Sequence, residues 1–325
     1  MNGLAELALT PLLAKFQSPG PDLFSLGPIT VRWYGLLIAI AVLIGVTISQ
    51  QLAQKRGVDP EKIGDLLLWV IPCGIVCARI YYVLFEWSSY ASRPLEAFAI
   101  WQGGIAIHGA VIGGTLATWF FAKANRLSFW QLCDFVAPSL ILGQALGRWG
   151  NFFNSEAFGG PTDLPWKLFI PLNNRPAGYQ DVEYFHPTFL YESLWNLGVF
   201  ALLIGLFFWG LTRPRFRAGT VFLVYMIAYG AGRVWIEGLR TDSLMLGPIR
   251  VAQLISLATI ALGWIGLIWT YGMGKRLPDN SYALSNGSVG SAGSPSNAPT
   301  PGNMASDRLS KARRPDNRPG KDSPQ

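Results

Sequence analysis

Charged residues are scarce in this 325-residue sequence: Asp, Glu, Lys and Arg make up 14% of it, against roughly 25% in soluble domains. The mean hydropathy is +0.30, which argues against a soluble globular domain. Tryptophan and glycine are abundant instead, with 13 and 36 residues. Trp favours membrane interfaces, and Gly is more common in membrane helices than in soluble ones. The composition therefore predicts an all-α, polytopic integral membrane protein.

Histidine and cysteine are also scarce, with two and three residues. Cys73, Cys77 and Cys133 lie within apolar runs, so we interpret them as packing residues and expect no disulfide framework. Cys73 and Cys77 are one helical turn apart, but no His or acid accompanies them as a further metal ligand. The sequence motifs of P-loop, dinucleotide-binding, serine-hydrolase and zinc-protease enzymes are absent. We therefore expect neither a metal site nor a cofactor.

The positive charge is concentrated near the C-terminal end. From residue 275 onward there are eight Lys or Arg and four Asp, so +4 of the net +7 lies there. Because residues 275–325 are rich in Ser, Asn, Gly and Pro, we expect a disordered cytoplasmic tail. We do not interpret its charge as a nucleic-acid signal. Residues 1–30 are interpreted as an interfacial arm without a secretory signal.

Seven segments are long and apolar enough to cross a bilayer, which takes about 20 largely apolar residues. The fourth is the weakest, because Asp134 and Pro138 interrupt it. Together the segments predict a seven-helix membrane domain over residues 31–274. They are residues 31–53, 63–85, 104–122, 130–146, 187–211, 219–239 and 248–271.

The orientation of these segments follows from Lys and Arg in the connecting loops, which are enriched on the cytoplasmic side. The loops after the first, third and fifth segments carry most of the basic residues, and the tail lies on the same side as these loops. We therefore predict an N-terminus outside and a C-terminus in the cytoplasm. The basic residues of these loops are Lys55, Arg56, Lys62, Lys123, Arg126, Arg213, Arg215 and Arg217.

This topology places the unusual polar residues at the outer end of the segments. Ionisable residues at membrane depth are costly unless paired or hydrated, so they indicate a functional site. A bundle with purely structural polar residues would distribute them between both ends. The converging residues are Tyr34, Arg79, His108, Arg148, Asn151, Asn154, Glu156, His186, Glu192, Arg233, Glu237 and Arg240.

The spacing of Arg233, Glu237 and Arg240 is i, i+4, i+7, which puts them on one helical face. They are either an intrahelical ion pair with a snorkelling end or a phosphate-binding stripe, since Arg suits bidentate phosphate recognition. Arg148 follows the fourth apolar run together with two asparagines and a glutamate. A cation with amides at the end of a span suits an anionic lipid head group.

The histidines are ambiguous from the sequence alone. His108 lies in a glycine-rich apolar helix and is either a hydrogen-bonded packing residue or a general base. His186 either caps a loop or belongs to the site, and Glu192 nearby either pairs with an arginine or takes part in the chemistry. Asp65 and Asp134 lie at the inner ends of their segments and are interpreted as helix N-terminal charges.

Five sequence blocks carry a family resemblance. Residues 147–160, which read GRWGNFFNSEAFGG, resemble the signature of bacterial prolipoprotein diacylglyceryl transferases. Residues 33–35, 78–83, 186–192 and 233–240 also agree with the family, and the resemblance covers residues 28–272 in the family's order. Ala110 and Ser155 depart from the usual His-Gly-Gly and Asn-Gly-Glu patterns, but neither change removes a reactive group.

The resemblance implies transfer of the diacylglyceryl group from phosphatidylglycerol to the lipobox cysteine thiol of a prolipoprotein signal peptide, with release of glycerol phosphate. It implies an inner-membrane enzyme that acts on the periplasmic side, has membrane lipids as neighbours and binds no nucleic acid. The family's important residues fall on Tyr34, His108, Arg148, Asn151, Glu156, Gly159, Arg233, Glu237 and Arg240.

These expectations lead to a hypothesis about residue roles. Arg148 and Arg233 bind the phosphate, Asn151 and Tyr34 donate hydrogen bonds, and Glu156 and Glu237 hold the arginines. His108 is either the base for the thiol or an electrostatic group. Two alternative functions remain, a phospholipid transporter or flippase without this chemistry and a membrane scaffold. The residues expected to be catalytic are Tyr34, His108, Arg148, Arg233 and Glu237, and those expected to bind phosphatidylglycerol are Arg79, Arg148, Asn151, Asn154, Glu156, Gly159 and Arg240.

Overall fold

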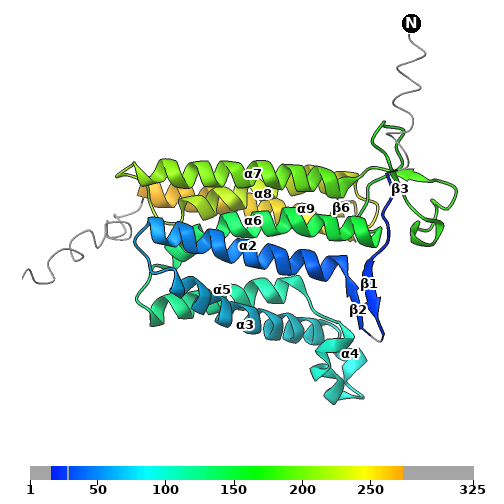
Figure 1. The fold of residues 1–325 in the computed structure, drawn as a ribbon, viewed down its shortest axis with the longest axis horizontal. Coiled ribbons are helices and arrows are strands. Elements are labelled where there is room, and N and C mark those ends of the chain that lie inside the picture. The colour runs from blue at the N-terminus through cyan, green and yellow to red at the C-terminus, as the bar shows by residue number, and fades with distance from the viewer. Residues whose placement is uncertain (1–15, 28, 274–325) are drawn as a thin grey trace, which may run out of the picture. The chain divides into compact units, whose positions relative to one another are not determined.

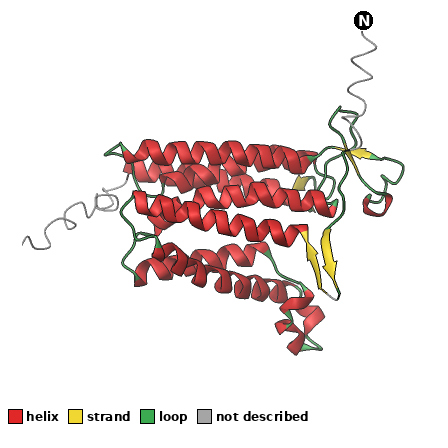
Figure 2. Cartoon of the chain, viewed as in Figure 1, coloured by secondary structure: helices red, strands yellow, loops and turns green. Residues whose placement is uncertain are grey.

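Long helices dominate the computed structural model, which describes residues 16–27 and 29–273 (Figures 1 and 2). Within these residues a helix forms at each of the seven predicted places. The predicted tail, residues 275–325, and the first 15 residues of the predicted arm lie outside the described residues. The seven helices are α2 (Trp33–Lys55), α3 (Glu61–Phe85), α5 (Ile107–Ala124), α6 (Phe129–Asn154), α7 (Thr188–Leu211), α8 (Thr220–Leu239) and α9 (Val251–Ile268).

The membrane character is carried most clearly by four of these helices. Among the described residues, α2, α3, α7 and the stretch Val251–Gly272 are long and apolar enough to cross a membrane. These four confirm an α-helical membrane protein. The crossing of α5, α6 and α8, and the orientation of the termini, remain predictions.

Short loops join the helices at one end, which we call the loop end; they span residues 56–60, 125–128 and 212–219. Small strands and short helices lie at the other end, which we call the hairpin end (Figure 1). These short strands are additions to the all-α architecture. Four of the six described strands are only two residues long, and strands this short are set by their backbone partners rather than by an apolar pattern. Three antiparallel pairs form: β1 (Asp22–Leu26) with β2 (Ile29–Arg32), β3 (Leu168–Phe169) with β4 (Tyr184–Phe185), and β5 (Met245–Leu246) with β6 (Ile249–Arg250). The short helices of the hairpin end are α4 (Trp87–Tyr90), η1 (Pro94–Phe98), η2 (Ile100–Gln102) and η3 (Leu172–Asn174), whereas η4 (Trp269–Met273) follows α9.

Helix α6 is central to the fold because it packs against α2, α7 and α8. It starts at the Ser128 cap, whose side chain accepts from the Gln131 amide at 3.4 Å. It continues to Asn154, well beyond the predicted end of the segment at residue 146, and ends at Ser155 in a left-handed conformation with φ 52°. Arg148 and Asn151 therefore lie on its last turns rather than after them, which aims them across neighbouring helices.

Asp134 was interpreted as a charge at the start of its own helix, but it serves another helix. Its carboxylate accepts from the Gly219 amide at 2.7 Å and from the Phe222 amide at 2.9 Å. Both amides belong to the start of α8, where a negative charge is favoured by the helix dipole. Asp134 thus ties α6 to α8 at the loop end, and this explains a fully buried acid in an apolar segment.

Close packing of α3 against α5 explains the role of Cys73 and Cys77. A Cβ on Gly109 or Gly113 would overlap the backbone of α3 at Cys77 and Cys73. Glycine at these positions lets the helices approach closely, as in other membrane helix pairs. All three cysteines are free, and Cys73 and Cys77 have the packing role that their apolar setting predicts.

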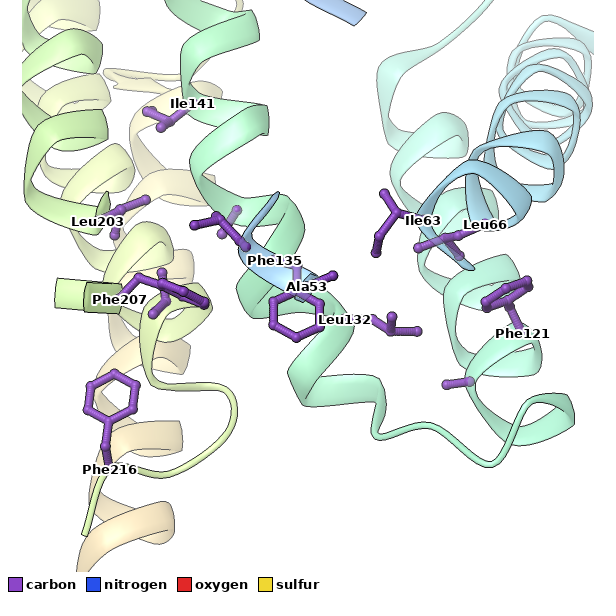
Figure 3. Close-up of a cluster of buried hydrophobic side chains, with 14 of the residues drawn as sticks. Ala53, Ile63, Leu66, Phe121, Leu132, Phe135, Ile141, Leu203, Phe207 and Phe216 are labelled. Carbon is purple, nitrogen blue, oxygen red and sulfur yellow. The ribbon is translucent and has the colours of Figure 1, made fainter. Parts of the chain in front are cut away.

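Two apolar cores hold the helices. The larger core, at the loop end, includes Phe135, Ile141, Leu203 and Phe207 from α6 and α7 (Figure 3). The second, at the hairpin end, joins α6 and α7 to the connection between them, residues 155–187. It is built from Phe152, Phe158, Leu168, Ile170, Phe185 and Phe189. This second core fixes the ends of α6 and α7, from which the polar residues project.

Candidate functional site

Glu192 is the centre of the polar cluster at the hairpin end. One carboxylate oxygen lies 2.7 Å from Nη2 of Arg148, and the other lies 3.0 Å from Nη1 of Arg233. The three residues come from α7, α6 and α8. A single carboxylate therefore joins two arginines that are far apart in the sequence. We call Arg148, Glu192, Arg233 and Glu237 the arginine cluster.

Glu237 completes this cluster as an i, i+4 partner of Arg233, with an N–O distance of 2.7 Å. The two carboxylates are almost fully buried, at 4% and 3% exposed, whereas Arg148 and Arg233 retain 19% and 16%. Two positive and two negative charges balance, which lowers the cost of placing arginines in an apolar bundle. The exposed parts of the two arginine side chains are then available to an anion.

A second set of hydrogen bonds extends from Arg148 along the end of α6. Its Nη1 donates to the Asn151 side-chain oxygen at 3.3 Å. The Asn151 and Asn154 amide groups in turn donate to one oxygen of Glu156, at 2.9 and 3.1 Å. Glu156 therefore orients two amides rather than an arginine, and the arginine-holding role expected of it is taken by Glu192.

Tyr34 reaches the same region through a close contact with Gly150. A Cβ on Gly150 would overlap the Tyr34 ring, whereas one on Gly147 would meet no atom within 4 Å. The neighbouring Trp33 stacks on Phe153 with ring centroids 4.5 Å apart. The start of α2 is thereby held against the last turns of α6. Gly150 and Phe153, which make these contacts, are close to Arg148 and Asn151 along α6.

Gly159 has a structural role that its neighbours explain. Its amide donates to the His186 carbonyl at 2.9 Å, and the next amide, of Gly160, donates to the Leu239 carbonyl at 2.9 Å. A Cβ on Gly159 would come within 2.7 Å of the His186 Cβ and 3.0 Å of the Leu239 carbonyl. Gly159 and Gly160 thus join the start of α7 to the end of α8. His186 pairs with this loop through its backbone, and its ring Nδ1 lies 3.3 Å from the Tyr191 hydroxyl. Its two interpretations remain predictions.

Arg240 departs from the predicted stripe because α8 ends at Leu239 and Arg240 is extended. Its side chain forms a double hydrogen bond with Asp242, at 2.9 and 2.7 Å. Burial raises the pKa of Asp242, but the hydrogen bonds and charge of Arg240 outweigh burial and hold that pKa below its usual value. Arg240 is therefore paired with Asp242 and is not part of the arginine cluster.

Arg79 and His108 lie on the other helix pair, α3 and α5. The buried Arg79 guanidinium donates to the carbonyls of residues 96, 97, 103 and 104 at 2.6–2.8 Å and so shapes the connection into α5. His108 is exposed in the first turn of α5 and stacks on Tyr81, with ring centroids 5.7 Å apart. Among the described residues, no hydrogen bond or ion pair joins either side chain to the arginine cluster. Substrate contact by Arg79 and base catalysis by His108 remain predictions.

The polar character continues one turn below the cluster. Gln144 precedes Arg148 by four residues and donates to the Tyr225 hydroxyl at 3.0 Å. Asn196 follows Glu192 by four residues and is fully buried. Both therefore lie on the faces that carry the charged residues. Among residues 16–27 and 29–273, no group of three His, Cys, Asp or Glu side chains is placed to hold a metal ion.

Sequence reasoning left the role of Glu192 open, although the pairing with an arginine that it considered is confirmed. A usable signal was present: an acid in the first turns of a strongly apolar segment that contains no Lys or Arg. Such a residue needs cationic partners from other helices. The sequence could not show that it has two partners, from α6 and α8.

Comparison with known proteins shows the family to which the chain belongs. The family model for prolipoprotein diacylglyceryl transferase matches residues 21–269. The chain is 64% identical over 270 residues to the phosphatidylglycerol–prolipoprotein diacylglyceryl transferase of Nostoc sp., covering 83% of this chain and 95% of the relative. It is 59% identical over 266 residues to the Synechocystis sp. protein of the same name, covering 82% and 94%. For the Gloeobacter violaceus protein the identity is 56% over 260 residues, covering 80% and 96%.

Proposed function

The chain belongs to the prolipoprotein diacylglyceryl transferase family, and from this premise we propose that the arginine cluster binds the phosphate of phosphatidylglycerol during transfer. The enzyme moves the diacylglyceryl group of phosphatidylglycerol to a prolipoprotein. The acceptor in this proposal is the thiol of the lipobox cysteine in the signal peptide. A thioether forms, the bond between the glycerol carbon and the phosphate oxygen breaks, and glycerol phosphate leaves.

The observation that carries the proposal is the pair of arginines oriented by one buried carboxylate. Each guanidinium has five N–H donors, and contacts to carboxylates and to Asn151 use only part of this set. The remaining donors suit the bidentate geometry of a phosphate. Because Glu192 and Glu237 hold both groups in place, little reorganisation is needed when charge develops on the leaving oxygen.

Deprotonation of the thiol needs a separate group, because a free cysteine has a pKa of about 8.5. We assign the base to His108, which is exposed at the hairpin end of α5 and carries an imidazole, the side chain most often used as a general base. Phosphatidylglycerol then lies between the arginine cluster and His108. His108→Gln should abolish turnover while phosphatidylglycerol still binds. Retained turnover in this variant would remove the base assignment and leave His108 an electrostatic role.

We also propose that all seven long helices cross the inner membrane, with the hairpin end on the periplasmic side. The short loops at the loop end carry Arg56, Arg126, Arg213, Arg215 and Arg217, with Lys55, Lys62 and Lys123 beside them, which favours a cytoplasmic location for this end. A single cysteine placed at Asp163 should react with an impermeant thiol reagent in intact spheroplasts. A single cysteine placed at Arg126 should react only after lysis. The opposite pattern would invert the orientation.

A phospholipid transporter is the less favoured alternative. It would need a polar path to the opposite leaflet, and among the described residues the core at the loop end is built from apolar side chains. The relatives named above are transferases. The structure and the relatives therefore both favour the enzyme.

The direct experiment combines purified full-length protein, phosphatidylglycerol and a lipobox peptide with one cysteine, and follows the peptide mass. A gain of one diacylglyceryl group is expected with the Cys peptide and none with its Cys→Ser counterpart. Arg148→Ala should reduce the gain severely, since it loses charge and bidentate geometry together. No gain with folded wild-type protein that binds phosphatidylglycerol would refute the transferase assignment, and a near-normal Arg148→Ala would refute the phosphate role.

A further inference from the structure

A groove lies at the loop end, away from the arginine cluster. It has a volume of about 650 Å³ and is bounded by Leu206 and Trp209 of α7, by Trp264 and Leu267 of α9, and by Arg213 and Arg215 of the loop between α7 and α8. This volume lies in the range of small-molecule sites, roughly 300–1,000 Å³. Most of its lining side chains are apolar or aromatic, and Arg213 and Arg215 are its charged lining residues.

The loop that carries these arginines is fixed by three contacts. The Phe216 ring is buried against Gly210, where a Cβ would come within 2.6 Å of the ring. The Arg56 guanidinium lies over the same ring, 5.7 Å from its centroid. The Gly219 amide at the end of the loop is held by Asp134. Arg213 and Arg215 are therefore presented on a fixed backbone.

The positive charge of Arg213 and Arg215 is not paired with a carboxylate among the described residues. Arg213 lies over Trp209 at 5.2 Å, but among residues 16–27 and 29–273 neither Arg213 nor Arg215 has a carboxylate within ion-pair distance. The segment from Thr212 to Gly219 contains no acid. An occupant that complements the groove therefore has an anionic end and an apolar body.

The position of the groove indicates which kind of amphiphilic molecule would occupy it. Helices α7 and α9 both qualify as membrane spans, and Trp209, Trp264 and Tyr271 are half exposed at their ends, as is typical of the membrane interface. Basic pockets between membrane helices at that level bind acidic lipid head groups. We propose that the groove binds one anionic diacyl phospholipid from the leaflet at the loop end. Its phosphate lies between Arg213 and Arg215, and an acyl chain lies against Trp264 and Leu267.

This lipid is distinct from the substrate, because it occupies the opposite end of α7 and α8 from Glu192 and Arg233. Photo-crosslinking tests the proposal directly. The full-length protein is reconstituted with phosphatidylglycerol or phosphatidylethanolamine that carries a photoreactive acyl chain, and labelled peptides are identified by mass spectrometry. Peptides containing Trp209 and the stretch from Trp264 to Tyr271 should be labelled more strongly by the anionic lipid. The variant R213Q/R215Q should lose this label by at least about fivefold.

The matched control is K123Q/R126Q. These residues also lie at the loop end, and Lys123 lies over Trp119 at 5.3 Å much as Arg213 lies over Trp209, but they are on α5 and in its following loop. Its label should equal that of the wild type. Equal labelling by both lipids, or an equal loss in K123Q/R126Q, would overturn the proposal in favour of unspecific packing or a diffuse surface charge. Transferase activity of R213Q/R215Q verifies that the fold is intact.

Discussion

At the scale of single residues, Glu192 has the most consequential position, because it orients two arginines from different helices. Glu192→Gln removes the negative charge but keeps the side-chain shape. We expect kcat to fall at least about tenfold, since loss of orientation at the leaving group costs more than about 1.4 kcal/mol. The KM for phosphatidylglycerol should not rise, because the cluster becomes more positive. The measurement is the peptide assay over a range of lipid concentrations.

The control for this variant is Glu183→Gln, which alters an acid at the same end that pairs loosely with Arg175 at 3.9 Å. It should leave both kinetic constants unchanged. An unchanged kcat in Glu192→Gln would show that the shared carboxylate is not needed for catalysis.

Two glycines of α6 give a matched pair of predictions about Tyr34. Gly150→Ala puts a methyl group into the Tyr34 ring and should displace it, whereas Gly147→Ala meets no atom within 4 Å. We expect Gly150→Ala to lower activity by about tenfold or more, since small displacements of positioning groups have large effects on catalysis. Gly147→Ala should remain near wild type. Equal activity of the two variants in the peptide assay would mean that the placement of Tyr34 is unimportant.

At the scale of elements, the sequence predicted the helices well but not the hairpin end. The apolar runs fix where α2, α7 and α8 lie, because about 20 apolar residues favour a single structure in a membrane. The end of α6 was placed too early, since the polar residues after Leu146 resemble a loop in composition. They are helical because Glu192, Tyr34 and the aromatic core cover them, and these partners lie far away in the sequence. The strands β3 and β4 depend in the same way on pairing between Leu168 and Phe185.

The contact of α3 with α5 also makes an element-scale prediction. In Gly113→Ala the new Cβ would come within 2.5 Å of the Cys73 carbonyl, but in Gly114→Ala it meets only Val70, at 3.6 Å. We expect Gly113→Ala to destabilise the protein by about 1–3 kcal/mol, as overpacking does. Gly114→Ala should be neutral or stabilise by up to about 1 kcal/mol. Thermal unfolding in detergent measures both, and equal melting temperatures would contradict close packing at Gly113.

At the scale of the whole molecule, the sequence placed Tyr34, Arg148, Arg233 and Glu237 at one end through loop charges and helix count alone. This placement succeeded because consecutive helices run in opposite directions, so that successive loops lie at alternate ends of the bundle. It could not separate Arg79 from the arginine cluster, because both lie at the hairpin end and only packing shows that Arg79 binds carbonyls of the connection between α3 and α5. The end of the bundle at which a polar residue lies is therefore predictable from the sequence, whereas its neighbours on other helices are not.

The division between the helices and the C-terminal segment leads to a prediction for the full chain. The family match ends at residue 269, and the Nostoc relative is covered over 95% of its own length by 83% of this chain. Residues 281–325 thus lie beyond the stretch that the family model matches. We expect their deletion to change transferase activity per folded protein by less than about twofold, as terminal segments outside a domain are usually tolerated. The peptide assay, normalised to protein that elutes as a single species, measures this. A large loss of activity with an unchanged melting temperature would mean that the segment takes part in substrate delivery, a role that the helices alone do not predict.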